Sequence, residues 1–273
     1  MTSSNRVTSH PQETDPFQSD YRRAELASLN SLDLLSASYL PGALPELPDL
    51  SSEALWADMA TYETIPDFRL RRLRQVVSRL PQKGKILDIG SGWGEIIPMV
   101  KESPDREYVA MDFSKQMLEQ LEKKFPAVRT INGAIDAVNE TFDVIMALEV
   151  CEHIPASQIM KFYADVQKSL VKGGMFIVTV PLYENLKAQT LQCPNCHHMH
   201  NRMGHVRSYT PELVAKELKL GGFEVMDLSF VYLNFNDTAA GTLKRVLINW
   251  ARALTGLGRF MPLNAVIVAR VTG

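Results

Sequence analysis

The chain has 273 residues, an apolar fraction of 45% and a net charge of −2 at pH 7. This length is enough for one full domain with additions, and the balanced charge gives no reason to expect generic nucleic-acid binding. The three cysteines are too few for a disulfide framework, which favours a reducing compartment. Because no apolar run reaches the roughly 18 residues of a membrane-spanning helix and no secretion signal opens the chain, we expect a cytoplasmic protein.

The amino-terminal part has two compositions. Residues 1–50 are rich in polar residues and then in proline, which predicts a largely disordered or extended segment. Residues 51–81 predict two amphipathic helices, the first after Ser51 and Ser52 and the second over 68–80. The second carries four arginines mostly away from its apolar side: Arg69, Arg71, Arg72 and Arg74. A solvated helix face is favoured over an anion-binding one.

An apolar strand over 85–88 ends in Asp88 and runs into a loop made of Gly90, Ser91, Gly92, Trp93 and Gly94. Alternating glycines permit a tight turn and the close approach of a ligand, and a helix expected from about Trp93 would direct backbone N–H groups at it. A dinucleotide loop requires glycine where Glu95 stands, and this carboxylate would repel a pyrophosphate. The spacing favours a ligand with a carboxylate, an ammonium and no phosphate, such as S-adenosylmethionine. A purely structural strand-to-helix turn is the alternative.

A second strand over 108–111 ends at Asp112, and Ser114 is the expected N-cap of a helix over 115–123. An acid at the tip of this strand can accept hydrogen bonds from both ribose hydroxyls of an adenosyl group. A solvated acid is the alternative. The alternation then continues with strands over 127–131, 141–148 and 175–180, a helix over 156–170 and a turn at 172–174. This pattern predicts an α/β fold with a doubly wound parallel sheet covered on both faces.

The chain resembles the class I S-adenosylmethionine-dependent methyltransferases, in the branch that includes quinone O-methyltransferases. The resemblance covers about residues 82–232 and rests on four segments: Leu87–Gly94, Met111–Ser114, Phe142–Ile154 and Leu170–Ile177. It implies a seven-stranded, mostly parallel Rossmann-like sheet with an N-terminal helical extension. The implied methyltransferase domain spans 51–273, with a cofactor-binding core over 82–182 and a C-terminal part over 211–273 whose two strands, 223–232 and 264–271, pair antiparallel.

The resemblance also implies roles for single residues. The glycines would wrap the methionine end of the cofactor, Asp112 would hold the ribose, Phe113 would pack against the adenine, and Glu149 with its backbone would face the cofactor. Many relatives carry Gly-Asp-Ala after the third strand, whereas this chain has Asn-Gly-Ala-Ile-Asp over 132–136. A contact from Asp136 is therefore left open. The full cofactor-binding set is Asp88, Gly90, Ser91, Gly92, Gly94, Asp112, Phe113, Glu149 and the backbone N–H groups of Ala134 and Ile135.

His153 follows the fourth strand at the edge where α/β proteins bind ligands. If the methyl acceptor is a hydroxyl, this histidine is the candidate general base, and a capping or packing histidine is the alternative. We expect a methyltransferase acting on a small-molecule or lipid-like acceptor, with O-methylation favoured. The alternative function is a non-catalytic module that binds RNA or protein.

Residues 183–210 contain two cysteines spaced as Cys-x-x-Cys and then several histidines. Two thiolates and two imidazoles suit a tetrahedral structural zinc ion. The predicted ligands are Cys193, Cys196, His200 and His205, although His197 or His198 could replace one histidine. A redox pair or two unbound thiols are the alternatives. The position of this Cys/His knuckle predicts a loop over the acceptor entrance, and the non-catalytic alternative would use it for contact with a partner.

Beyond the knuckle, Thr210 is the expected cap of a helix over 211–220. A longer amphipathic helix over 242–254 contains Trp250. We expect it to pack on the domain, with weak contact to a membrane surface as the alternative. The sequence leaves the acceptor and the oligomeric state open.

Overall fold

The computed structural model describes residues 67–192, 197, 199–232 and 263–272. Several predictions lie outside these residues, namely the segment 1–50, the helix after Ser51, the ligands Cys193 and Cys196, and the helix over 242–254.

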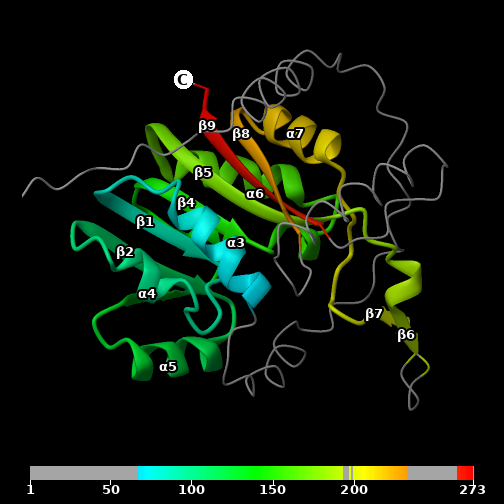
Figure 1. The fold of residues 1–273 in the computed structure, drawn as a ribbon, viewed down its shortest axis with the longest axis horizontal. Helices are drawn as coiled ribbons and strands as arrows, with labels where there is room; N and C mark the ends of the chain where they lie inside the picture. The colour runs from blue at the N-terminus through cyan, green and yellow to red at the C-terminus, as the bar shows by residue number, and fades with distance from the viewer. Residues whose placement is uncertain (1–66, 193–196, 198, 233–262, 273) are drawn as a thin grey trace, which may run out of the picture.

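The core of the protein is a seven-stranded sheet with the order β3-β2-β1-β4-β5-β9-β8 (Figure 1). The first five strands in this order are parallel, and β9 runs antiparallel to both of its neighbours. The arrangement confirms the predicted doubly wound, mostly parallel sheet and its antiparallel closing pair. The strands are β1 (Gly84–Ile89), β2 (Arg106–Asp112), β3 (Arg129–Asn132), β4 (Phe142–Leu148), β5 (Leu170–Leu182), β8 (Phe223–Tyr232) and β9 (Leu263–Val271).

Helices cover both faces of the sheet because successive side chains of a strand point to opposite sides. In β4, Ile145 packs in the cluster shared with α6 and α7, whereas Val144 and Met146 pack in the cluster shared with α3, α4 and α5. The helices are α3 (Asp67–Val77), α4 (Ile97–Val100), α5 (Lys115–Lys124), α6 (Ile159–Lys168) and α7 (Pro211–Leu220), with 3-10 turns η2 (Ile135–Ala137), η3 (Cys151–His153) and η4 (Lys187–Gln189). Among the described helices, none is long and apolar enough to span a bilayer.

Two helix starts are capped as predicted. The Ser114 side chain accepts a hydrogen bond from the backbone N–H of Met117, and the Thr210 side chain accepts one from Leu213. Pro211 stands in the first turn of α7, where its missing N–H costs nothing. These caps set the residues at which α5 and α7 begin.

Two local expectations are wrong. The helix expected from about Trp93 is only the four-residue α4, which begins at Ile97 and is followed by more turns, so no long helix aims its dipole from the glycine loop. Pro98 sets that start, since proline is tolerated only in a first turn. The turn expected at 172–174 lies inside the continuous strand β5. Gly173 has φ 72°, and the pairing register between β4 and β5 shifts between Phe142 and Val144. These two features together are a β-bulge.

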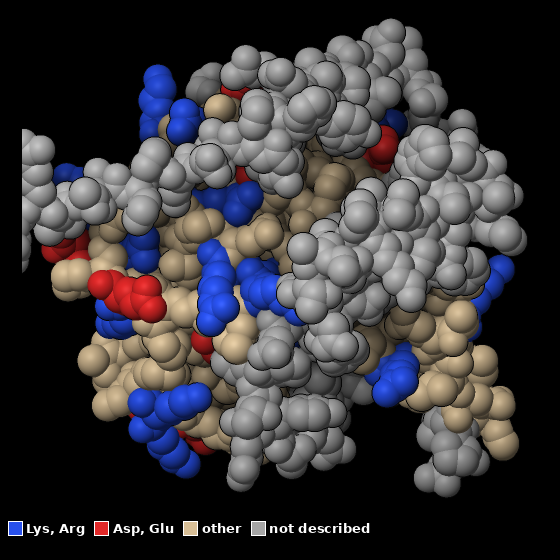
Figure 2. Space-filling model, in the orientation of Figure 1, with Lys and Arg blue, Asp and Glu red and all other residues tan. Residues whose placement is uncertain are grey.

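A small antiparallel hairpin, β6 (Thr190–Gln192) and β7 (Met199–Asn201), stands apart from the main sheet (Figure 1). The chain returns from it through an isolated parallel bridge between Tyr209 and Leu182 at the end of β5. On the part of the surface that Figure 2 describes, basic side chains occur at several separate places with acidic ones between some of them.

Candidate functional site

The loop after β1 holds three glycines in left-handed backbone conformations, with φ 71° at Gly90, 52° at Gly92 and 75° at Gly94. A Cβ atom at Gly90 would lie 2.7 Å from Val150 Cγ2, and one at Gly94 would lie 2.3 Å from Ile97 Cδ1. A Cβ at Gly92 would meet no atom of the described residues within 4 Å. Packing therefore requires two of the glycines, and the third borders open space.

Asp112 ties this loop to the tip of β2. Its Oδ2 accepts from the backbone N–H of Gly92 at 2.9 Å, and its Oδ1 accepts from Ser114 at 2.8 Å. The Asn132 side chain donates to the carbonyls of Asp112 and Phe113, at 3.0 and 2.9 Å, so the end of β3 joins the same network. An ionised carboxylate has about four acceptor positions, so Asp112 retains acceptor capacity for a ligand.

Open space and an exposed aromatic ring adjoin this acid. Phe113 is 67% exposed, and a Cβ at Gly133 in the loop after β3 would meet no atom within 4 Å in the part of the chain that the structure describes. Ile135 lies in the core at the start of η2, and the Asp136 carboxylate pairs with Lys161 at 2.9 Å. The loops after β1, β2 and β3 thus leave room beside one carboxylate and one planar apolar surface, as the cofactor prediction requires.

The Asp88 side chain is more deeply buried than that of Asp112. Tyr108 donates its hydroxyl to Asp88 Oδ2 at 2.5 Å, and both side chains are buried. Burial raises the pKa of Asp88 to about 7, and the hydrogen bond from Tyr108 opposes this rise. The observed partner is thus a protein hydroxyl, and a cofactor contact from Asp88 stays a prediction.

Two arginines of α3 pair with carboxylates at the sheet edge. Arg69 lies 3.0 Å from Glu95 after the glycine loop, and Arg72 lies 2.8 Å from Glu149 after β4. The favoured interpretation of the arginines as a solvated helix face is wrong for Arg69 and Arg72, because both form ion pairs and Arg72 is only 7% exposed. The interpretation is confirmed for Arg74, which is exposed. The pairs fix α3 over the carboxyl ends of the central strands.

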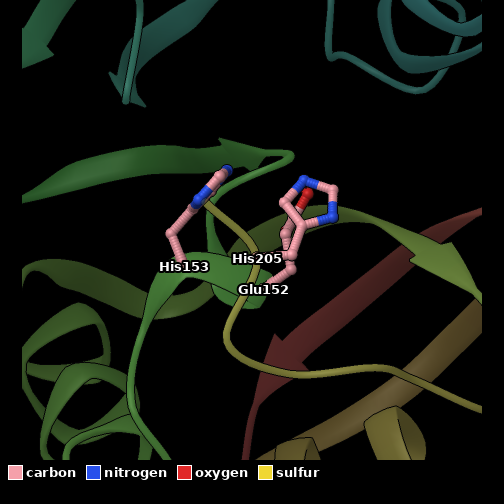
Figure 3. Close-up of side chains that lie close together, drawn as sticks. All are labelled: Glu152, His153 and His205. Carbon is pink, nitrogen blue, oxygen red and sulfur yellow. The ribbon is translucent and has the colours of Figure 1, made fainter. Parts of the chain in front are cut away.

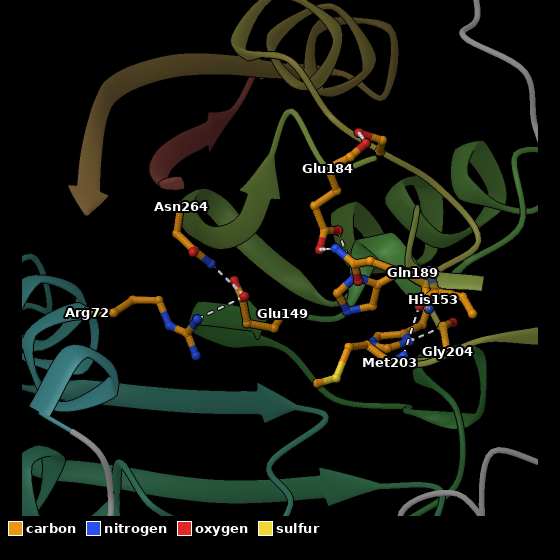
Figure 4. A network of polar contacts seen from close by, with 11 residues as sticks. Arg72, Glu149, His153, Glu184, Gln189, Met203, Gly204 and Asn264 are labelled. Carbon is orange, nitrogen blue, oxygen red and sulfur yellow. Dashed lines mark hydrogen bonds and ion pairs between the residues drawn. The ribbon is translucent and has the colours of Figure 1, made fainter. Parts of the chain in front are cut away.

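Glu149 lies in a polar network at the end of β4 (Figure 4). Its Oε2 accepts from Arg72 at 2.8 Å and from Asn264 of β9 at 2.5 Å, and its Oε1 accepts from the Thr179 hydroxyl at 2.8 Å. The backbone of Glu149 has φ 58°, a strained conformation for a residue other than glycine, which such a network can hold in place. The observed partners of the carboxylate are protein groups, and a cofactor contact from Glu149 or its backbone stays a prediction.

A second polar cluster lies next to this one, where Glu152, His153 and His205 come together (Figure 3). His153 Nδ1 lies 3.1 Å from the Gly204 carbonyl, and the rings of the two histidines meet edge to face at 4.8 Å. Burial and then the neighbouring His205 lower the pKa of His153 to about 4. His153 is therefore neutral at pH 7 and donates from Nδ1.

Glu152 is fully buried, and neither of its carboxylate oxygens has a hydrogen-bond partner within the described residues. Burial, and then the charge of Glu149, raise its pKa well above the usual range. His205 Nδ1 lies 2.7 Å from Glu184 Oε2, and both side chains are largely buried. Sequence reasoning missed Glu152 and Glu184; the only sequence signal was that Glu152 adjoins His153.

Backbone contacts hold the two halves of this cluster together. The N–H groups of Val206 and Arg207 donate to the Glu152 carbonyl at 2.9 and 3.2 Å, and the Tyr209 hydroxyl donates to the Cys151 carbonyl at 3.2 Å. Of the predicted zinc ligands, His205 is therefore fixed against η3, while His200 lies half-buried on β7. The knuckle stays a prediction, because both cysteines lie outside the described residues. Cys151 is a buried free thiol.

Comparisons with known proteins agree with this architecture. Residues 86–174 match the family model of the methyltransferase domain. An uncharacterized methyltransferase-like protein of Schizosaccharomyces pombe is 30% identical over 93 residues, which cover 33% of this chain and 36% of that protein. Cyclopropane-fatty-acyl-phospholipid synthase of Escherichia coli K12 is 22% identical over 127 residues, which cover 46% of this chain and 33% of that enzyme. The chain thus spans about a third of the length of these curated relatives.

Solved structures show the same fold at low identity. The N-methyltransferase NodS of Bradyrhizobium japonicum, solved with S-adenosyl-L-homocysteine, matches with a TM-score of 0.55 and 14% identity, over 81% of this chain and 99% of that chain. The sheet order, the glycine loop and the acid after β2 therefore define the class I methyltransferase fold. Within it, residues 86–174 are the segment similar to the methyltransferase domain family.

Proposed function

We propose that this protein transfers the methyl group of S-adenosylmethionine to a small-molecule or lipid-like acceptor, with a hydroxyl oxygen favoured. One observation carries the proposal: the left-handed Gly92 borders open space while its N–H is held by Asp112, at the edge where parallel α/β sheets bind ligands. The match of residues 86–174 to the methyltransferase domain supports it.

The described residues suit each part of this cofactor. The backbone of the glycine loop would surround the methionine end, where the buried Ser91 hydroxyl has no partner among the described residues. The remaining acceptor positions of Asp112 would take the ribose hydroxyls, and the exposed ring of Phe113 would cover the adenine. The backbone of Ala134 and Ile135 would close the far side of the ring.

Methyl transfer is an in-line displacement. The acceptor oxygen forms a bond to the methyl carbon while the carbon–sulfur bond breaks, its electron pair stays on sulfur, and the hydroxyl proton leaves to a base. The protein gains most by holding the two reactants together and excluding water. His153 lies near the end of β4 as its predicted role as the base requires, but a pKa of about 4 makes it a weak proton acceptor.

The acceptor class is supported by similarity alone. The matched Escherichia coli enzyme is by its name a synthase acting on fatty-acyl phospholipids, which favours a lipid-like acceptor here. The quinone O-methyltransferase branch suggested by the sequence motifs favours a hydroxylated ring with an apolar tail. Both suggestions share an apolar acceptor.

Transfer of tritium from methyl-labelled S-adenosylmethionine to a panel of hydroxylated aromatic compounds, fatty acids and phospholipid vesicles tests this proposal. We expect label in at least one apolar acceptor, and less of it with the Asp112→Ala variant when the cofactor is below saturation. Tight cofactor binding without transfer to any acceptor would favour the non-catalytic module that binds RNA or protein. If calorimetry detects no binding of S-adenosylmethionine, the proposed function is wrong.

A further inference from the structure

We propose that Glu152, His153 and His205 bind one divalent transition-metal ion, Zn²⁺ foremost, and that Glu184 orients His205 toward it. One potential ligand atom from each of these three residues lies within 4.8 Å of those of the other two (Figure 3). Around a tetrahedral ion with bonds of about 2.1 Å, ligand atoms stand roughly 3.4 Å apart. Small side-chain rotations therefore close the site.

Glu152 gives the first independent reason for a cation. Its carboxylate is wholly buried, and both oxygens lack a partner among the residues that the structure describes. The negative charges of Glu149 and Glu184 disfavour the ionised form of Glu152, whereas the positive charge of Arg72 favours it. Both buried oxygens therefore lack partners in the described part of the chain, and a metal ion would supply one together with the counter-charge that an ionised carboxylate requires there.

The orientation of the two imidazoles gives the second reason. Metal-binding histidines donate the N–H of their other ring nitrogen to a carboxylate or a backbone carbonyl, which fixes the tautomer. Here His205 Nδ1 lies 2.7 Å from the Glu184 carboxylate, and His153 Nδ1 lies 3.1 Å from the Gly204 carbonyl. Both contacts place the ring lone pair on Nε2, which is then the ligand atom of each histidine.

The ligand types select the metal. Two imidazoles and one carboxylate suit Zn²⁺ and related first-row ions, whereas Mg²⁺ and Ca²⁺ prefer sites built from oxygen. Three protein ligands leave a fourth position for a small molecule. This consequence rests on the proposed function: an acceptor hydroxyl bound there would have a lowered pKa and would release its proton to solvent water, so that His153 would serve as a metal ligand and not as the base.

The site differs from the predicted Cys/His knuckle, with which it shares only His205. We therefore place the test in the full-length Cys193→Ser/Cys196→Ser chain, which has no knuckle thiolates. The chain is stripped with a chelator and dialysed against Zn²⁺, its zinc content is measured by elemental analysis, and its affinity is measured by competition with a chromogenic chelator. Folding of every variant is checked by circular dichroism.

We expect one zinc per chain in this background and loss of that zinc with Glu152→Gln or His205→Ala. Glu184→Gln, which alters the carboxylate beside His205 and leaves the three proposed ligands in place, should weaken zinc binding by about 10- to 100-fold. Glu224→Gln, an exposed glutamate on β8, is the matched control and should bind zinc unchanged. If Glu152→Gln fails to fold, the zinc affinity of Glu184→Gln relative to Glu224→Gln tests the site instead.

A folded serine background that holds no zinc, or zinc binding equal in the Glu152→Gln, Glu184→Gln and Glu224→Gln variants, would overturn the site. The two proposals fail separately. Zinc binding without methyl transfer would support the metal site and contradict the proposed function. Cofactor binding and methyl transfer by a chain that binds no zinc would support the proposed function and contradict the metal site.

Discussion

Arg72 Nη1 lies 2.8 Å from Glu149 Oε2, and this pair joins α3, which precedes the sheet, to the end of β4 in its centre. Asn264 and Thr179 complete the shell around the same carboxylate. One acid thus holds a helix and three strands together beside the glycine loop, and its own backbone is strained. The predictions below test this pair and the site next to it.

Arg72→Met should lower the free energy of unfolding by roughly 3 kcal/mol, because it leaves the Glu149 carboxylate without its counter-charge in a largely buried place. Urea unfolding measures the loss. Arg74→Met, on the exposed side of the same helix, should change stability by about 0.5 kcal/mol or less. Adding Glu149→Gln to Arg72→Met should restore part of the stability. Equal losses for Arg72→Met and Arg74→Met would show that the pair contributes little.

Gly92→Ala and Gly94→Ala should have different effects although both place alanine at positive φ. At Gly94 the new Cβ would collide with Ile97, so we expect a large loss of thermal stability. At Gly92 the Cβ enters open space, so only the backbone strain of about 1 to 2 kcal/mol remains. Gly92→Ala should instead weaken S-adenosylhomocysteine binding by at least about tenfold in calorimetry, since the methyl group occupies ligand space. Unchanged affinity in a folded Gly92→Ala protein would contradict the placement of the cofactor.

Asp112→Ala should weaken cofactor binding by about 1 to 3 kcal/mol, because the ribose hydroxyls lose a charged acceptor and the Gly92 N–H loses its anchor. Isothermal titration with S-adenosylhomocysteine measures this effect. Glu107→Ala, an exposed acid on the same strand, is the control and should bind as the unaltered protein does. Similar affinities of the two variants would count against Asp112 as the ribose ligand.

Asp88 should make stability fall as pH rises from 5 to 8. Its pKa is about 7 in the folded protein against about 3.9 in an unfolded chain, so in this range the folded state holds a proton that the unfolded state has lost. This contribution is favourable below about pH 4 and is lost above pH 7. Urea unfolding of the ligand-free protein should therefore show its stability relative to Asp88→Asn decreasing between pH 5 and 8. Parallel pH curves would mean that Asp88 keeps an ordinary pKa.

Local signals along the chain were enough to predict the sheet and the loop after β1. The strand signals are continuous apolar runs such as 144–148, which favour burial on both faces, and the caps Ser114 and Thr210 act on backbone groups within three residues. The glycines at 90, 92 and 94 predicted a ligand-binding loop, because glycine adopts left-handed backbone conformations more readily than other residues do. All of these signals are local in the chain.

The contacts between distant side chains depend on the packing of the whole fold and could not be predicted from local signals. Arg72 reaches Glu149 across 77 positions, and His205 meets His153 across 52 positions, because the sheet brings the ends of its strands to one edge. The sequence assigned His205 to nearby cysteines and the arginines to solvent, since spacing along a chain carries no record of which partners burial will bring together. The charges and imidazoles of the site therefore acquire their roles from the packing of distant segments, whereas the loop that frames them was already determined by its own residues.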